Sequence, residues 1–318
     1  MLPLSNVGGQ PNEFVSSPNI QNQISQVLGK VDHRFNDTNN LSGEYALFNE
    51  HRYNPFDPLA SFTNIPGNGS FTDNRGQIVR IEYNHAFSAK LLNDLRIGFN
   101  RSRGGIFQQS FGTNVSQQLG FPTVLSNSLD LGPPNVAIAG FSFIGQPENT
   151  PQDRRDNTFH YADTLAWHPD FNGGRHQFKF GADIRRFQLN FYLDELARGQ
   201  WTFNGGVSAA SVASAAVDPL LPPLVDLLEG TPNFAISVSG NTQTEERTTE
   251  TDFFAQDDIR ITSRFTLNLG VRWEFNSPVV DTHNRLSDPI LTPAALTCSP
   301  QPDCQFIIAG TDGLPRAT

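Results

Sequence analysis

The stretch from Phe253 to Phe275, FFAQDDIRITSRFTLNLGVRWEF, contains two segments in which apolar and polar residues alternate, joined by a short turn. Alternation with a period of two is typical of a β-strand that has one apolar and one polar face. A turn near Ser263 sets Phe253 opposite Trp273, so the apolar faces of both segments coincide. Soluble strands average about five or six residues, whereas each of these segments runs about ten to twelve, the length that a tilted strand needs to cross a bilayer. We therefore predict a membrane-spanning β-hairpin.

Three further hairpins repeat this alternation, in residues 26–50, 79–100 and 157–192. In the second hairpin, Glu82 is expected opposite Arg96 on the polar face. In the third, the apolar residues change parity near Arg185 and Arg186, which predicts either a β-bulge or the point where the strand leaves the membrane.

The turns inside the hairpins are short, whereas the segments 51–74, 104–152 and 193–248 between hairpins are long. Short periplasmic turns and long extracellular loops are typical of outer-membrane barrels. We therefore predict an all-β fold, an antiparallel transmembrane β-barrel segment of about eight to ten strands. Residues 200–203 and 234–238 would be the two extra strands or mere extensions above the membrane. The sequence PPLVDLLEG predicts a short helix that ends at Gly230, and the Ala/Ser-rich residues 207–217 predict another.

The predicted organisation has an irregular lead-in over residues 1–25, a partial barrel over 26–278 and an extracellular loop over 279–318. The first residues, MLPLSNVGGQPNEF, contain neither the basic nor the apolar part of a secretory signal, so we expect the chain to be a portion of a longer exported protein. Cys298 and Cys304 lie in the last segment, and their spacing predicts a disulfide in an oxidising compartment, the alternative being two unlinked thiols.

The bulk composition excludes two classes of protein. The sequence contains no run of about 18 apolar residues, which excludes a transmembrane helix. A formal net charge of −10 argues against a nucleic-acid partner, whose phosphates require a basic surface. A hydrophobic content of 37% does not exclude a membrane barrel, because only every second residue of a barrel strand faces lipid.

The polar faces of the predicted strands carry charges that could line a substrate path or contact a plug. The candidate lining residues are Arg80, Glu82, Arg96, Asp258, Arg272 and Glu274. The numbers of basic and acidic residues on the polar faces are nearly equal, so the charges indicate neither an anionic nor a cationic substrate. The simpler interpretation is a solvated wall whose charges compensate one another.

The sequence contains no recognisable catalytic, cofactor or metal motif, and the histidines show no ligand spacing. Asp257 and Asp258 are adjacent on a strand and therefore point to opposite faces, which excludes a shared catalytic role. Asp257 falls on the otherwise apolar face, where it is tolerable only near the periplasmic interface. We expect aromatic residues such as Trp167 and Trp273 at the membrane interfaces.

The stretch FFAQDDIRITSRFTLNLGVRWEF resembles the barrel motif of TonB-dependent receptors, and KVDHRFNDTNNLSGEY, HQFKFGADIRRF and DLLEGTP resemble the Oar-like branch. This resemblance covers roughly residues 26–278. It implies a 22-stranded barrel, location in the outer membrane of a Gram-negative-type bacterium, contact with outer-membrane lipid, and energised uptake or a surface receptor role through the TonB system. Full members also carry a plug, which we cannot place in this sequence, and eight to ten strands would not close such a barrel. The ligand is an unknown small molecule, glycan or peptide, and we expect no enzymatic activity.

Two other interpretations are open. A soluble extracellular β-sandwich that binds carbohydrate would show the same alternation. A glycoside hydrolase would require two carboxylates that converge in one pocket, roughly 5 to 9.5 Å apart.

Overall fold

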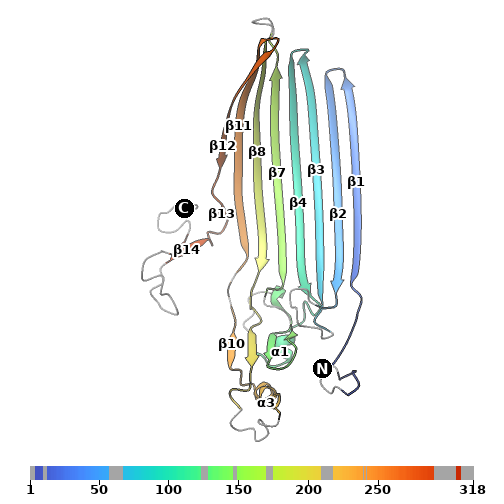
Figure 1. Ribbon diagram of the computed structural model, residues 1–318, viewed down its shortest axis with the longest axis vertical. Coiled ribbons are helices and arrows are strands. Elements are labelled where there is room, and N and C mark those ends of the chain that lie inside the picture. The colour runs from blue at the N-terminus through green and yellow to red at the C-terminus, as the bar shows by residue number, and fades with distance from the viewer. Residues whose placement is uncertain are drawn as a thin grey trace.

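A single layer of eight long antiparallel strands dominates this computed structural model (Figure 1). The structure describes residues 4–9, 13–56, 67–122, 128–145, 149–169, 175–208, 218–238, 240, 242–289 and 306–308. The strands in spatial order are β1 (Gln21–Asn36), β2 (Asn39–Asn54), β3 (Ser70–Ser88), β4 (Leu91–Gln108), β7 (Gln152–Trp167), β8 (His176–Leu193), β11 (Thr244–Thr262) and β12 (Phe265–Asn276). Strand β13 (Val280–Asp281) also pairs with β11. The all-β antiparallel prediction is confirmed.

Three of the hairpin turns share the same side-chain to backbone hydrogen bond. Each is two residues long, and the last side chain before it accepts a hydrogen bond from the backbone N–H two residues on. The acceptors are Asn36, Ser88 and Thr262, with N–O distances of 2.9, 3.2 and 3.2 Å. Asn, Ser and Thr favour such turns because their short polar side chains reach the nearby backbone. Figure 1 shows these turns together at one end of the sheet, opposite the longer connections.

The register confirms the predicted hairpin faces. Phe253 lies opposite Trp273, and Glu82 lies opposite Arg96. The β-bulge considered near Arg185 is not present, because β8 pairs without interruption with both β7 and β11. The apolar residues Phe187, Leu189 and Phe191 therefore lie on the polar face of β8. They belong to the part of the strand that extends beyond the apolar band.

The strands are longer than expected and extend into the predicted loops. Seven of them have 16 to 19 residues, and β12 has 12. Strand β1 begins at Gln21, inside the predicted lead-in. Several residues that were predicted to lie in the long segments between hairpins belong to strands β2, β3, β4 and β11. At about 3.3 Å per residue, most strands are over 50 Å long, whereas an apolar band about 25 Å tall needs roughly 33 Å of strand at a barrel tilt near 40°.

A small second sheet lies beyond the end opposite the turns (Figure 1). It contains β10 (Phe234–Ile236), β9 (Gln200–Phe203), β5 (Asn135–Ile138) and β6 (Ile144–Gly145), in that order. Its buried core is Val136, Ile138 and Phe203, and α3 (Leu221–Glu229) packs against it. β9 and β10 therefore do not extend the wall, which has eight long strands. We call residues 109–151 and 194–243, as far as described, the loop cap.

Helix α3 ends as predicted, with Gly230 in the left-handed conformation at φ 68°. The cap also contains α1 (Val115–Gln118) and a short 3-10 turn, Ser128–Asp130. Neither described α-helix is long and apolar enough to cross a membrane. The helix expected at residues 207–217 falls almost wholly outside the described residues, as do Cys298 and Cys304, whose disulfide stays a prediction. β14 (Ser287–Pro289) and β15 (Phe306–Ile308) pair near the C-terminal end.

The described residues form one single-layer wall rather than two facing sheets of similar size, so the β-sandwich alternative is wrong. The apolar face of this wall carries aromatic contacts. Trp167 stacks on Phe178 with ring centroids 5.5 Å apart, and Phe253 stacks on Trp273 at 5.9 Å. Asp257 shares this face with Phe178, its partner in the register. Asp257 is thus close to the turn end, where the sequence predicted it to be tolerated.

Candidate functional site

All six candidate lining residues lie on one face of the wall. Residues that are directly paired between strands share a face, and the register links Glu82 to Arg96, Arg96 to Ala162, Ala162 to Asp183, Asp183 to Asp252 and Asp252 to Glu274. The other three, Arg80, Asp258 and Arg272, are an even number of residues from members of this row on their own strands. We call this the polar face. Its role as a lumen wall stays a prediction.

The charges on the polar face are compensated mainly along each strand. Arg96 Nη2 lies 2.6 Å from Asp94 Oδ2, so Arg96 pairs within its strand and not with Glu82 across from it. Arg272 pairs with Asp252 at 2.6 Å and also with Glu274. Asp258 accepts a hydrogen bond from Gln256 at 3.0 Å. Exposed pairs of this kind contribute only about 0–1 kcal/mol each, so they leave the side chains available to other partners.

A hollow of about 510 Å³ opens on the polar face where β4 carries Gly98. Gly98 lies opposite Arg80 on one side and His160 on the other, and it contributes no side chain to fill the row. The guanidinium groups of Arg80, Arg96 and Arg185 line the hollow. His160 Nε2 lies 3.0 Å from both carboxylate oxygens of Asp183.

The arginines around the hollow are exposed, and nearby carboxylates neutralise their positive charge only in part. The side chains of Arg80, Arg96 and Arg185 are 67%, 57% and 42% exposed. Arg80 is 3.8 Å from Glu44, and Arg185 is 3.2 Å from Asp183 and 3.7 Å from Glu250. An arriving carboxylate or phosphate would exchange these pairs for bidentate bonds with the guanidinium groups. The arrangement suits transient binding of an anionic group more than catalysis.

Sequence reasoning identified Arg80 and Arg96 but not the hollow, which depends on Gly98. Arg185 was also among the charges that the sequence assigns to the polar face, and the structure brings it to the hollow. Among the described residues, no three His, Cys, Asp or Glu side chains gather as a metal-binding group.

A buried arginine connects the separate segments of the loop cap with one another. Arg198 is 5% exposed and donates to the backbone carbonyls of Pro133 at 3.1 Å, Asp130 at 3.3 Å and Thr150. Tyr192, at the end of β8, donates its hydroxyl to Asp130. These bonds connect three segments that are 20 to 68 residues apart in sequence.

Burial changes the acid–base properties of this cluster. It raises the pKa of Asp194 to about 6, with a further contribution from the nearby carboxylate of Asp130. Burial also lowers the pKa of Arg198 to about 10, while Asp130, Tyr192 and Asp194 oppose that change. Arg198 is therefore still charged at neutral pH. Because many backbone carbonyls converge on one guanidinium, we interpret this cluster as the structural anchor of the cap.

One family model matches the chain, and a solved structure resembles it distantly. Among solved structures, the outer membrane transporter YddB from Escherichia coli matches with a TM-score of 0.49 and 10% sequence identity. The match covers 82% of this chain and 29% of that chain, so the chain spans less than a third of the length of that transporter. No curated protein matches the sequence. The family model of the outer membrane beta barrel domain matches residues 1–318. The chain therefore belongs to the outer membrane beta barrel domain family and is located in the outer membrane.

Proposed function

We propose that this chain forms part of the wall of a TonB-dependent outer-membrane receptor of the Oar-like type, without enzymatic activity, and that its polar face lines the route of the ligand. The observation that carries the proposal is the polar face itself. Six charged residues predicted to share a face do so, and beside them Gly98 opens a hollow flanked by three accessible arginines. The motifs shared with TonB-dependent receptors support the energised character of uptake.

The open edges of the wall fit a larger barrel. Strands β1 and β12 form the edges of the eight-stranded sheet. An unpaired strand edge is costly in lipid because its backbone N–H and C=O groups have no partners there. Further strands that pair with β1 and β12 would complete the wall, and a plug inside it would contact the polar face.

The chemistry of the hollow favours a ligand, or a plug segment, that presents an anionic group. The nearby carboxylates Glu44, Asp183 and Glu250 keep that interaction reversible, because they compete for the same guanidinium groups. Reversible binding is what passage along a wall requires.

Single-cysteine variants in the full-length protein in cells test the wall assignment. Thiols at Glu82 and Arg96 should react with a water-soluble maleimide, whereas thiols at Ile81 and Ile97 should be protected and instead contact a lipid-soluble spin label. Equal reactivity at both sets would overturn the wall assignment.

Solute depletion from the medium tests energised uptake. Cells that carry the gene should deplete at least one solute that cells without it leave, and a protonophore or loss of TonB should abolish that difference. Gene-dependent depletion that is insensitive to both treatments would overturn the TonB assignment and leave the wall assignment intact.

A further inference from the structure

The face opposite the polar face changes from apolar to cationic toward the loop-bearing end. Val79, Phe99 and Phe159 form one of its last apolar rows, since each is paired with the next in the register. Four residues further along the same strands, Arg75 lies opposite Arg103, and Arg103 lies opposite Arg155. Arg101 adds a fourth guanidinium on the same face. We call Arg75, Arg101, Arg103 and Arg155 the outer arginine row.

Direct apposition of like charges across strands is destabilising unless a counter-charge is present. Within the described residues the row has one carboxylate partner, Asp153, which lies 3.3 Å from Arg103 Nε and 2.6 Å from Arg155 Nη2. Arg75 and Arg101 are exposed and form no ion pair with any described residue. Asp73, which lines an adjoining hollow beside Arg75, forms its ion pair with His51. The row therefore has unsatisfied positive charge that suits an anion.

Two adjoining hollows lie beside the row on the same face. The first, of about 330 Å³, is lined by Arg75 and Arg103 together with His51 and Gln23. The second, of about 380 Å³, shares His51 and Gln23 and continues to Tyr53, Phe71 and Gln109. Together they form a groove that runs from guanidinium groups to aromatic rings.

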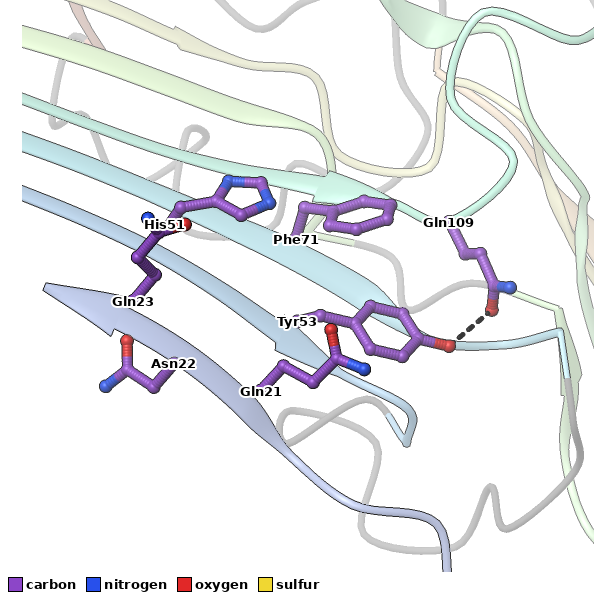
Figure 2. Close-up of a pocket in the computed structure, with 7 residues that line it drawn as sticks. All are labelled: Gln21, Asn22, Gln23, His51, Tyr53, Phe71 and Gln109. Atoms are coloured by element: carbon purple, nitrogen blue, oxygen red, sulfur yellow. Dashed lines mark hydrogen bonds between the residues drawn. The ribbon is translucent and has the colours of Figure 1, made fainter.

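Figure 2 shows the second hollow, with the rings of His51, Phe71 and Tyr53 near the amides of Gln21 and Gln23. The Tyr53 and Phe71 centroids are 5.1 Å apart, and His51 stacks on Phe71 at 5.7 Å. The Tyr53 hydroxyl donates to Gln109 Oε1 at 3.2 Å, which fixes the ring at the edge of the groove. Aromatic faces beside amide groups suit a sugar ring, which presents C–H bonds to the rings and hydroxyls to the amides.

The height of the arginine row fits the headgroup layer of a membrane, whereas Phe71, eight residues from Val79, lies about 20 Å above that residue. Four residues at about 3.3 Å each place the arginine row about 13 Å along the strands from Val79, or about 10 Å in height at a barrel tilt near 40°. The polar layers of a bilayer extend about 5–8 Å beyond each side of its hydrocarbon core. The side chains of the row thus point toward the lipid side of the wall at the level of phosphates and sugars.

We propose that this groove binds the phosphorylated headgroup of a glycolipid in the outer leaflet, with a phosphate at the membrane surface on Arg75, Arg101 and Arg103. Sugars that extend outward from that phosphate would lie against Tyr53 and Phe71, farther from the membrane. The inference rests on the proposed function in an outer-membrane wall and on its longer loops facing the cell exterior, as the sequence predicts, but it uses the opposite face of the wall from the ligand route.

Native mass spectrometry of the delipidated full-length protein in detergent tests this proposal. The probes are an acylated glucosamine disaccharide with two phosphates, its dephosphorylated counterpart, and inorganic phosphate. We expect the phosphorylated lipid to bind at least about tenfold more tightly than the dephosphorylated lipid, because arginine–phosphate bonds are charge-assisted. Inorganic phosphate at millimolar concentration should not displace it.

The double variant R75Q/R101Q should lose about tenfold or more in affinity for the phosphorylated lipid and keep its affinity for the dephosphorylated one. R154Q is the matched control, because Arg154 is adjacent to Arg155, exposed, and on the polar face. Heat-modifiable migration on gels verifies that each variant is folded. If R75Q/R101Q is unstable, R75K/R101K replaces it and should keep part of the affinity for the phosphorylated lipid, because it retains the positive charges. Unchanged binding by folded R75Q/R101Q, equal binding of both lipids, or full displacement by inorganic phosphate would each overturn the proposal.

Discussion

Asp257 Oδ2 lies 2.8 Å from His176 Nδ1 on the apolar face of the wall, and both side chains are 17% exposed. His176 also stacks on Phe178, with centroids 5.5 Å apart, so the pair is built into the aromatic region near the turns. A carboxylate here is tolerable because it has a partner and lies close to the aqueous side. The pair is thus a polar element on a mainly apolar face, which also carries the hydrogen-bonded pair Asn93 and Asp163.

His176→Ala should destabilise the protein by about 1–3 kcal/mol, because it leaves the half-buried Asp257 without its hydrogen-bond partner. The free energy of unfolding in lipid vesicles, measured with urea, provides the test. His33→Ala is the control, since His33 is exposed on the same face. The double variant H176F/D257L should restore most of the stability, because a well-packed apolar pair can replace a partly buried ionic one. Additive losses in the double variant would contradict this account.

The hairpins, their register and their two faces could be predicted from sequence because the alternation is strong within the apolar band. The strand ends could not. Beyond the band the alternation of apolar and polar residues is lost, so segments such as Arg101 to Gly105 look like loop although they continue β4. The outer arginine row was missed for this reason, since Arg75 and Arg155 were assigned to loops or to their margins.

The loop cap shows a second limit of sequence reasoning. Helix α3 could be predicted from local signals, Pro at its start and Gly230 at its end. The role of Arg198 could not, because its partners Pro133 and Thr150 are far away in the chain and are recognised through backbone carbonyls that carry no sequence signal. The hollow at Gly98 likewise arises from neighbours on two other strands.

Gly98→Trp should reduce gene-dependent solute uptake by about an order of magnitude, equivalent to about 1.4 kcal/mol of lost binding, because the indole fills the hollow between Arg80 and His160. A Cβ at Gly98 would lie 3.4 Å from His160 Cβ, so the backbone accepts a side chain there with little adjustment. Gly43→Trp serves as the control, since nothing lies within 4 Å of its Cβ position and it is on the apolar face. Equal effects of the two substitutions on uptake would show that the hollow has no special role.

Arg198→Met should destabilise the loop cap by about 3–5 kcal/mol, because it removes a buried charge together with its bonds to three carbonyl groups. Arg198→Lys should recover little, since an ammonium cannot reproduce the planar fork of the guanidinium. Added protease should cleave the cap of the variants on intact cells faster than that of the wild type. In the control variant Arg264→Lys, which changes a residue at an exposed turn, the protease should cleave the cap at the wild-type rate. Cleavage of the Arg198→Met cap at the wild-type rate would mean that the cap does not depend on Arg198.

Asp281 should make the junction between β11 and β13 sensitive to acid. Burial alone would raise its pKa, but hydrogen bonds from the Arg285 side chain and from the backbone N–H groups of Glu245, His283 and Arg285 outweigh it and lower the pKa below the usual range. A carboxyl group with a lowered folded-state pKa contributes stability that is complete above its unfolded pKa, near 4, and is lost as the pH falls below that value. The difference in unfolding free energy between wild type and Asp281→Asn should therefore be constant from pH 8 to 5 and shrink below about pH 4. Urea unfolding followed by a fluorophore at position 279 measures this difference, and a difference that grew on acidification would show that Asp281 does not act as a stabilising anion.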